Sequence, residues 1–172
     1  MRLYTRKGDD GTTGLLYGGR VAKDAPSIEA TGAVDEAQAF IGLARAEAER
    51  GSELDRILVA VERDLWVLMA ELATAPANRH KLTAGASLVT AEMVSHLETM
   101  VDDLGTKFPM PTEFVIPGQT RPSAVLDVAR TVVRRAERLA LAVEAARDPD
   151  AHVLPYLNRL STLLWVLARW QE

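Results

Sequence analysis

The chain has 172 residues, of which 48% are hydrophobic, and a formal net charge of −4 at pH 7. This length and composition suit one domain with a sizeable core, and the acidic balance argues against a general nucleic-acid binder. The sequence contains no cysteine, which excludes disulfides, thiolate metal sites and a cysteine nucleophile. No apolar run approaches the roughly 20 residues that span a bilayer, and the first residues lack the apolar core of a signal peptide. We therefore expect a cytoplasmic protein that binds neither a membrane nor nucleic acid.

The beginning of the chain is rich in glycine and also carries hydroxyl groups and charges. Gly8, Gly11 and Gly14 permit close backbone approach, so successive amide groups can form an anion-binding nest. Asp9 or Asp10 can hold a hydrated Mg²⁺. The segment matches neither a Walker A loop nor a Rossmann fingerprint. Nucleotide binding therefore competes here with the simpler interpretation of a flexible terminus.

Helical periodicity of apolar residues covers most of the remaining chain, and aromatic residues make up only 5% of it. A proline-containing loop with the apolar run Phe114-Val115-Ile116 precedes the fourth helical stretch. About five helices with short connections predict an all-α fold, a five-helix up-and-down bundle of the ferritin-like kind. The expected helices cover about residues 26–50, 52–72, 90–104 and 122–147, and a last helix begins at Pro155.

The fourth stretch carries a ladder of arginines. Arg130, Arg134 and Arg138 drift by only about 40° per step around a helix, so all three project from one side. Glu137 falls on the same side, and the neighbouring apolar Leu126 places the ladder at the rim of a core. Several guanidinium groups at such a rim suit a polyanionic ligand, because each can bind phosphate oxygens bidentately. The alternative is a solvated face of ion pairs at i,i+4 spacing.

Taken together, these segments resemble the PduO-type ATP:cob(I)alamin adenosyltransferases. The matching motifs keep their order and cover nearly the whole chain, so the combination is more specific than any one motif. The motifs are Tyr4-Thr5-Arg6-Lys7-Gly8-Asp9-Asp10-Gly11-Thr12-Thr13, Gly32-Ala33-Val34-Asp35-Glu36, Phe114-Val115-Ile116-Pro117-Gly118, the run from Ala129 to Arg138, and Tyr156-Leu157-Asn158-Arg159-Leu160-Ser161.

The resemblance implies one domain over residues 1–172, with residues 1–25 as an ATP-binding segment. It also implies a homotrimer whose active sites lie between neighbouring subunits. Members of the family transfer the 5′-deoxyadenosyl group of ATP to cob(I)alamin, forming adenosylcobalamin and releasing triphosphate. Mg²⁺ would accompany the ATP phosphates, and a cob(II)alamin reductase and a cobalamin-dependent mutase are the expected partners.

The resemblance also assigns roles to individual residues. Asp35 and Arg130 correspond to a pair that bridges subunits, and Phe114 to the aromatic residue at the lower face of the corrin. Together with Arg134, these residues form the implied catalytic group. The implied nucleotide-binding residues are Thr5, Arg6, Lys7, Gly8, Thr13, Gly14, Lys23, Arg134, Arg135, Glu137, Arg138 and Asn158.

Without the family, some of these residues have ordinary explanations. Phe114, beside two apolar residues, would be a core residue, and Asn158 a polar group satisfied by nearby backbone. Lys23 could equally be a surface lysine. The three tryptophans are interpreted as packing or trimer-contact residues: Trp66, Trp165 and Trp170.

Three positions depart from the family pattern. Asp127 stands where the pattern L-H-x-A-R has histidine, Gln38 where D-E-L-N has asparagine, and Gln119 where Pro-Gly-Gly has its second glycine. Asp127 adds a negative charge one helical turn before the arginines, which can change corrin or subunit contacts. None of the three changes removes an implied nucleotide ligand.

Three other functions compete with adenosyl transfer. A ferritin-like di-iron oxidase needs paired Glu-x-x-His motifs, which the sequence lacks. A nucleotide-binding or assembly module would keep the bundle and the cations without turnover. A helix-rich nucleic-acid binder fits least, given the acidic balance.

Overall fold

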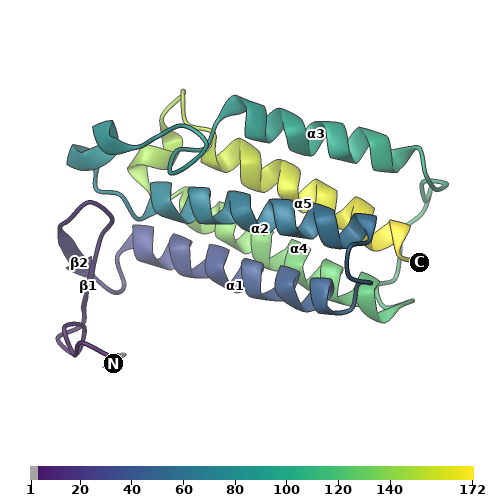
Figure 1. The fold of residues 1–172 in the computed structure, drawn as a ribbon, viewed down its shortest axis with the longest axis horizontal. Coiled ribbons are helices and arrows are strands. Elements are labelled where there is room, and N and C mark those ends of the chain that lie inside the picture. The colour runs from purple at the N-terminus through teal and green to yellow at the C-terminus, as the bar shows by residue number, and fades with distance from the viewer. Residues whose placement is uncertain (1–3) are drawn as a thin grey trace.

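A computed structural model describes residues 4–172 as a bundle of five long α-helices (Figure 1). The all-α, five-helix prediction is confirmed. A small antiparallel hairpin, which the sequence analysis did not predict, precedes the bundle. The elements are β1 Thr12–Gly14, β2 Arg20–Ala22, α1 Pro26–Ala46, α2 Glu53–Leu72, the 3₁₀ helix η1 Pro76–Lys81, α3 Ala91–Gly105, α4 Arg121–Ala140, the 3₁₀ helix η2 Glu144–Arg147 and α5 Val153–Trp170.

Successive long helices run in opposite directions along the bundle, as expected for an up-and-down arrangement (Figure 1). Helix α4 is central to the packing, because it lies against α1 on one flank and against α5 on the other. Helix α2 packs on α1, and α3 packs on α5. The hairpin lies at one end of the bundle, whereas the α3–α4 loop and the C-terminus lie at the other (Figure 1). Within residues 4–172, no helix has the length and apolar character needed to cross a membrane.

Local sequence signals account for the helix starts. The Ser52 hydroxyl accepts a hydrogen bond from the backbone N–H of Asp55 at 3.2 Å, as expected of an N-cap. Thr90 caps α3 in the same way, and Thr120 forms a capping box with Ser123 at the start of α4. These caps fix where three of the five long helices begin.

Three predicted helix boundaries are wrong. The segment 122–147 is not one helix. Helix α4 ends at Ala140, and Val143 adopts an extended conformation before η2 begins. Helix α1 ends at Ala46 rather than near residue 50, and Gly51 instead provides the left-handed turn, with φ 77°, that leads into α2. Helix α5 begins two residues before Pro155, which falls within the first turn, where a missing N–H breaks no helical hydrogen bond.

A phenol–carboxyl pair joins α5 to α2. Tyr156 on α5 is fully buried and donates its hydroxyl hydrogen bond to Oδ2 of Asp64 on α2, at 3.0 Å. Burial raises the pKa of the Asp64 carboxyl above its ordinary value, although the hydrogen bond from Tyr156 partly offsets this effect. Protonation of Asp64 is therefore easier in the folded chain than in water.

This pair predicts a pH-dependent stability. A carboxyl whose pKa is raised in the folded state contributes stability at low pH that is lost as the pH rises through that pKa. Asp64→Asn keeps an acceptor for Tyr156 but removes the titration. The free energy of unfolding of the variant, relative to that of the wild type, should therefore be greater at about pH 7 than at about pH 4. Urea unfolding at both pH values tests this, with Asp102→Asn on the exposed side of α3 as the control. A difference from wild type that is the same at both pH values would contradict the prediction.

Candidate functional site

The amino-terminal segment is organised by Arg20. Its guanidinium group donates from Nε to the Thr12 hydroxyl at 2.9 Å and from Nη2 to the Lys7 carbonyl at 2.5 Å. Asp10 accepts hydrogen bonds from the backbone N–H and the hydroxyl of Thr12, which lower the pKa of the Asp10 carboxyl. These contacts tie the chain before β1 to the hairpin. The segment therefore has a defined shape that the interpretation as a flexible terminus did not anticipate.

Gly8 lies directly against Lys23. A β-carbon added to Gly8 would come 3.2 Å from Nζ of Lys23, so a larger residue would push the ammonium group aside. The backbone N–H of Lys23 also donates to the carbonyl of Gly11 at 2.9 Å. The glycine-rich loop thus holds a lysine where the hairpin meets the bundle. Among the other implied ligands of the segment, Thr5, Arg6 and Lys7 are exposed and precede this contact, whereas Thr13 and Gly14 belong to β1.

Lys23 and Arg135 line the same small hollow. It has a volume of about 220 Å³ and lies between the end of the hairpin, α1 and α4. Arg135 forms an ion pair with Glu36 of α1 across this hollow. A cation of the amino-terminal segment and a cation of the arginine-rich helix therefore face one space, although about 110 residues separate them in the sequence.

The ladder arginines Arg134 and Arg138 are exposed on α4. Nη1 of Arg138 donates to the carbonyl of Arg134 at 3.0 Å. Within the described part of the chain, no ion pair links a ladder arginine to an acid four residues away, so the alternative of a face of i,i+4 pairs finds no support. The guanidinium groups of Arg134 and Arg138 therefore lie at the surface of the bundle.

Asn158 and Glu137 join α5 to α4. Nδ2 of Asn158 donates to Oε1 of Glu137 at 3.1 Å, and Oδ1 of Asn158 accepts from Nη1 of Arg159 at 2.6 Å. The alternative in which Asn158 is satisfied by nearby backbone is therefore wrong, since its amide contacts two side chains. Glu137 lies beside the exposed arginines, as the helical spacing predicted.

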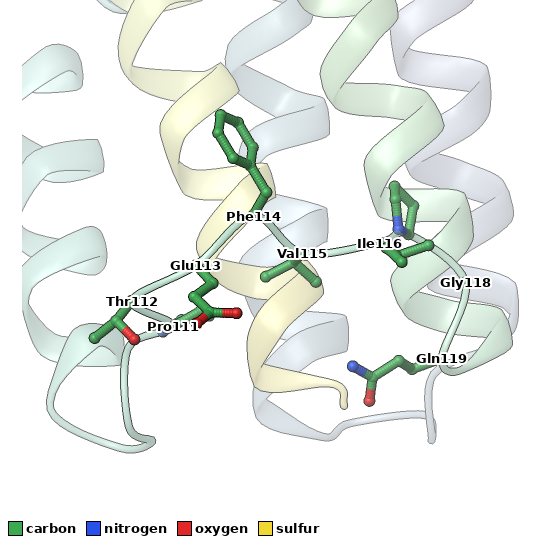
Figure 2. Close-up of a pocket in the computed structure, with 9 residues that line it drawn as sticks. Pro111, Thr112, Glu113, Phe114, Val115, Ile116, Gly118 and Gln119 are labelled. Atoms are coloured by element: carbon green, nitrogen blue, oxygen red, sulfur yellow. The ribbon is translucent and has the colours of Figure 1, made fainter.

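Phe114 lies in the α3–α4 loop and is fully exposed, at 106% of its reference area. Figure 2 shows its ring projecting away from the loop and along the helices rather than into the core. The interpretation of Phe114 as a core residue is therefore wrong. Ile116 of the same loop is also exposed, and neighbouring exposed apolar side chains are typical of a binding surface.

A second hollow lies between this loop and the bundle. It has a volume of about 490 Å³, and Phe114 shares its wall with Arg130 of α4 and with Trp165 and Arg169 of α5. Arg130 pairs with Asp127 at 2.9 Å within the same chain. Asp35 is exposed on α1, and within residues 4–172 Arg130 forms its ion pair with Asp127 rather than with Asp35. A bridge between these two residues from different subunits stays a prediction.

Sequence reasoning missed Arg20 and Arg169. The hairpin strands have only three residues each, too few for an alternating pattern to be visible. Arg169 had a usable signal, since it is a charged residue inside an otherwise apolar helix and such a charge requires a buried partner. Its partner is Asp127, 42 residues away in the sequence, which periodicity alone cannot identify.

The described residues define a helical-bundle protein with cationic groups at two hollows on either flank of one arginine-rich helix. The sequence profile of the cobalamin adenosyltransferase family matches residues 3–171. The chain belongs to this family.

Relatives and solved structures agree with this assignment. A corrinoid adenosyltransferase of Bacillus subtilis is 39% identical over 173 residues, covering 98% of this chain and 86% of the relative. One of Mycobacterium tuberculosis is 41% identical over 170 residues, covering 98% and 87%. The structure of a variant PduO-type ATP:corrinoid adenosyltransferase from Lactobacillus reuteri, complexed with cobalamin and ATP, matches with a TM-score of 0.86 and 27% identity over 99% of this chain and 90% of that one.

Proposed function

We propose that this protein transfers the 5′-deoxyadenosyl group of ATP to cob(I)alamin. Cobalt attacks C5′ of the nucleotide, the cobalt–carbon bond forms, and triphosphate leaves with the electron pair of the broken C5′–O bond. Membership of the cobalamin adenosyltransferase family supports this reaction. The structural observation that carries it is the hollow shared by Lys23 and Arg135, which joins the glycine-rich segment to the arginine-rich helix.

The nucleotide would lie between these two parts of the site. Backbone amides of a glycine-rich loop and nearby cations are a suitable environment for phosphate oxygens. The leaving triphosphate gains charge in the transition state, which the guanidinium groups of α4 can stabilise. The proposed nucleotide ligands are Thr5, Arg6, Lys7, Gly8, Thr13, Gly14 and Lys23 from the segment 1–25, and Arg134, Arg135, Glu137, Arg138 and Asn158 from the bundle.

Mg²⁺ enters this proposal as the counter-ion of the ATP phosphates. Within residues 4–172, no group of three or more histidine, aspartate or glutamate side chains is placed to hold a metal ion by itself. Triphosphate oxygens are ligands that Mg²⁺ prefers, and the ion commonly keeps several waters when it binds a nucleotide. The charge that Mg²⁺ supplies would add to that of the arginines at the leaving group.

The corrin would lie at the hollow beside Phe114. Cob(I)alamin is itself a strong nucleophile, so the protein needs no general base and acts mainly by positioning C5′ in line with cobalt. The exposed ring of Phe114 offers an apolar surface from which water and the lower cobalt ligand can be excluded. This role makes Phe114 important for producing the reactive, reduced state of cobalt.

A second copy of the chain would complete the site. The hollow that contains Lys23 is bounded by α1, whereas the hollow beside Phe114 is bounded by α5, so α4 separates the two within one chain. In a homotrimer, the hollow beside Lys23 of one subunit would face the hollow beside Phe114 of its neighbour, and the two together would form one active site. Asp35 of one subunit would there meet Arg130 of another. A cob(II)alamin reductase and a cobalamin-dependent mutase would act before and after the protein in the cytoplasm.

The outer surface of α1 and α4 is the proposed subunit contact. The Glu36–Arg135 pair shows how the antiparallel α1 and α4 align, and two turns further along Leu43 lies level with Val128. Both side chains are more than 40% exposed. Leu43→Glu should therefore yield a smaller species in analytical ultracentrifugation and lose most of its activity. Thr99→Glu, which adds the same charge to the exposed side of α3, should leave the oligomer intact. An unchanged sedimentation coefficient for Leu43→Glu would contradict the proposed contact.

The decisive experiment is anaerobic. Purified protein is mixed with MgATP and chemically reduced cob(I)alamin, the corrin spectrum is followed, and the phosphate product is identified. Adenosylcobalamin with triphosphate, rather than diphosphate, is the expected outcome. Saturable ATP binding without any conversion would instead assign the chain to the class of nucleotide-binding modules that do not turn over.

A further inference from the structure

We propose that Asp127 is a positioning residue that fixes the guanidinium group of Arg130 at the wall of the hollow beside Phe114. The inference rests on the proposed function, since it assigns that hollow to the reacting corrin. It concerns a residue at which this chain departs from its family, where a carboxylate replaces the expected histidine.

The carboxylate of Asp127 bridges two arginines. Oδ1 accepts from Nε of Arg130 at 2.9 Å, and Oδ2 accepts from Nη2 of Arg169 at 2.6 Å. Only 6% of the Asp127 side chain is exposed, so both contacts are shielded from water and are stronger than a surface ion pair. Each oxygen is therefore committed to a different guanidinium group.

Arg169 anchors the far side of this bridge. Its side chain is 2% exposed, and Nη2 also forms an ion pair with Oε1 of Glu172 at 2.9 Å. Its guanidinium carbon lies 5.8 Å from the ring centre of Trp165, and within the described residues its Nε is buried without a partner. A guanidinium group so enclosed has little freedom, which holds Asp127 in place as well.

Arg130 is the more exposed of the two arginines that Asp127 joins. Its side chain remains partly exposed and lines the 490 Å³ hollow together with Phe114 and Trp165. Among residues 4–172, the hydrogen bonds of Arg130 use Nε, which leaves both terminal nitrogens for an occupant of the hollow. A long side chain fixed before the substrate arrives spares the entropy of ordering it during binding. Asp127 also offsets the positive charge that Arg130 and Arg169 would otherwise add together.

The test compares two carboxylates that hold the same Arg169. Asp127→Asn weakens the contact to Arg130, whereas Glu172→Gln weakens only the contact to Arg169. With saturating MgATP, Asp127→Asn should lower kcat about 10- to 100-fold, and its ATP dissociation constant from calorimetry should stay within about twofold of wild type. Glu172→Gln should keep kcat within about threefold. In an Arg130→Gln background, Asp127→Asn should cost nothing further, because the residue through which it acts is gone.

A second readout does not depend on turnover. The Arg130 Nε–H resonance, assigned by its loss in Arg130→Lys, should exchange slowly with solvent in the wild type and in Glu172→Gln, and rapidly in Asp127→Asn. Equal losses of kcat in Asp127→Asn and Glu172→Gln, or continued protection of Arg130 in Asp127→Asn, would overturn the positioning role. Failure of the wild-type protein to form adenosylcobalamin would instead contradict the proposed function, while the exchange experiment still decides whether Asp127 fixes Arg130.

Discussion

Arg134→Ala should slow adenosyl transfer by about 100- to 1,000-fold, the size of effect found when one donor to a developing negative charge is removed. Arg134 is exposed at the centre of the arginine ladder, between the Arg130 of one hollow and the Arg135 of the other. Its charge would therefore act where the triphosphate leaves. The free energy of unfolding should change by less than about 1 kcal/mol, because an exposed arginine contributes little to packing.

Single-turnover kinetics and thermal unfolding of the same preparation separate these two effects. Arg63→Ala is the matched control, since Arg63 is exposed on α2, outside both hollows. It should leave transfer and stability near wild type. A folding defect in Arg134→Ala with normal turnover per folded molecule would show that the ladder serves the bundle rather than the reaction.

Much of the bundle follows from local sequence signals. The apolar stripes of the five helices and the hydroxyl caps at Ser52 and Thr90 act over a few residues, so their effects are visible in the sequence itself. Helix ends are harder to predict, because they depend on which neighbouring residues become buried. The helical composition after Ala140 favoured continuation, yet the chain turns at Val143 and buries Ala146 in the second 3₁₀ helix. Tertiary packing overrides helix propensity at this point.

In the candidate site, too, the sequence predicts one part and not another. The side of α4 that carries Arg130, Arg134 and Arg138 follows from the helical repeat alone. The meeting of Lys23 with Arg135 does not, because it depends on how the hairpin folds back onto α1 and α4. The resemblance named these two residues as ligands of one nucleotide, but the sequence contains no local signal of their proximity.

The charge of Asp127 was visible in the sequence, but its environment was not. A carboxylate before a run of arginines suggested a change in corrin or subunit contacts, whereas the structure buries it against Arg169. Burial changes the physical meaning of the substitution, since a buried carboxylate holds its partners more firmly than an exposed one. A departure from a family pattern can therefore reorganise the support of a site without altering the groups that face the ligand.

Phe114→Ala should give a large loss of activity that depends on how cobalt is reduced. Because the Phe114 side chain projects into solvent, its removal creates no cavity and should leave stability near wild type. If the ring excludes the lower ligand of cobalt, turnover that starts from cob(II)alamin with a reductase should fall by orders of magnitude. Turnover with chemically generated cob(I)alamin should fall much less, because the reduction step is then bypassed.

Ile116→Ala provides the control from the same loop. Ile116 is 84% exposed and lies two residues further along, but it does not line the hollow shared by Phe114, Arg130 and Trp165. Its removal should affect both assays little. Equal damage to the two assays by Phe114→Ala would mean that the ring contributes to general corrin binding rather than to reduction. Equal effects of the Phe114 and Ile116 variants would mean that the loop needs apolar surface of any kind, and that the position of the aromatic ring is not what matters.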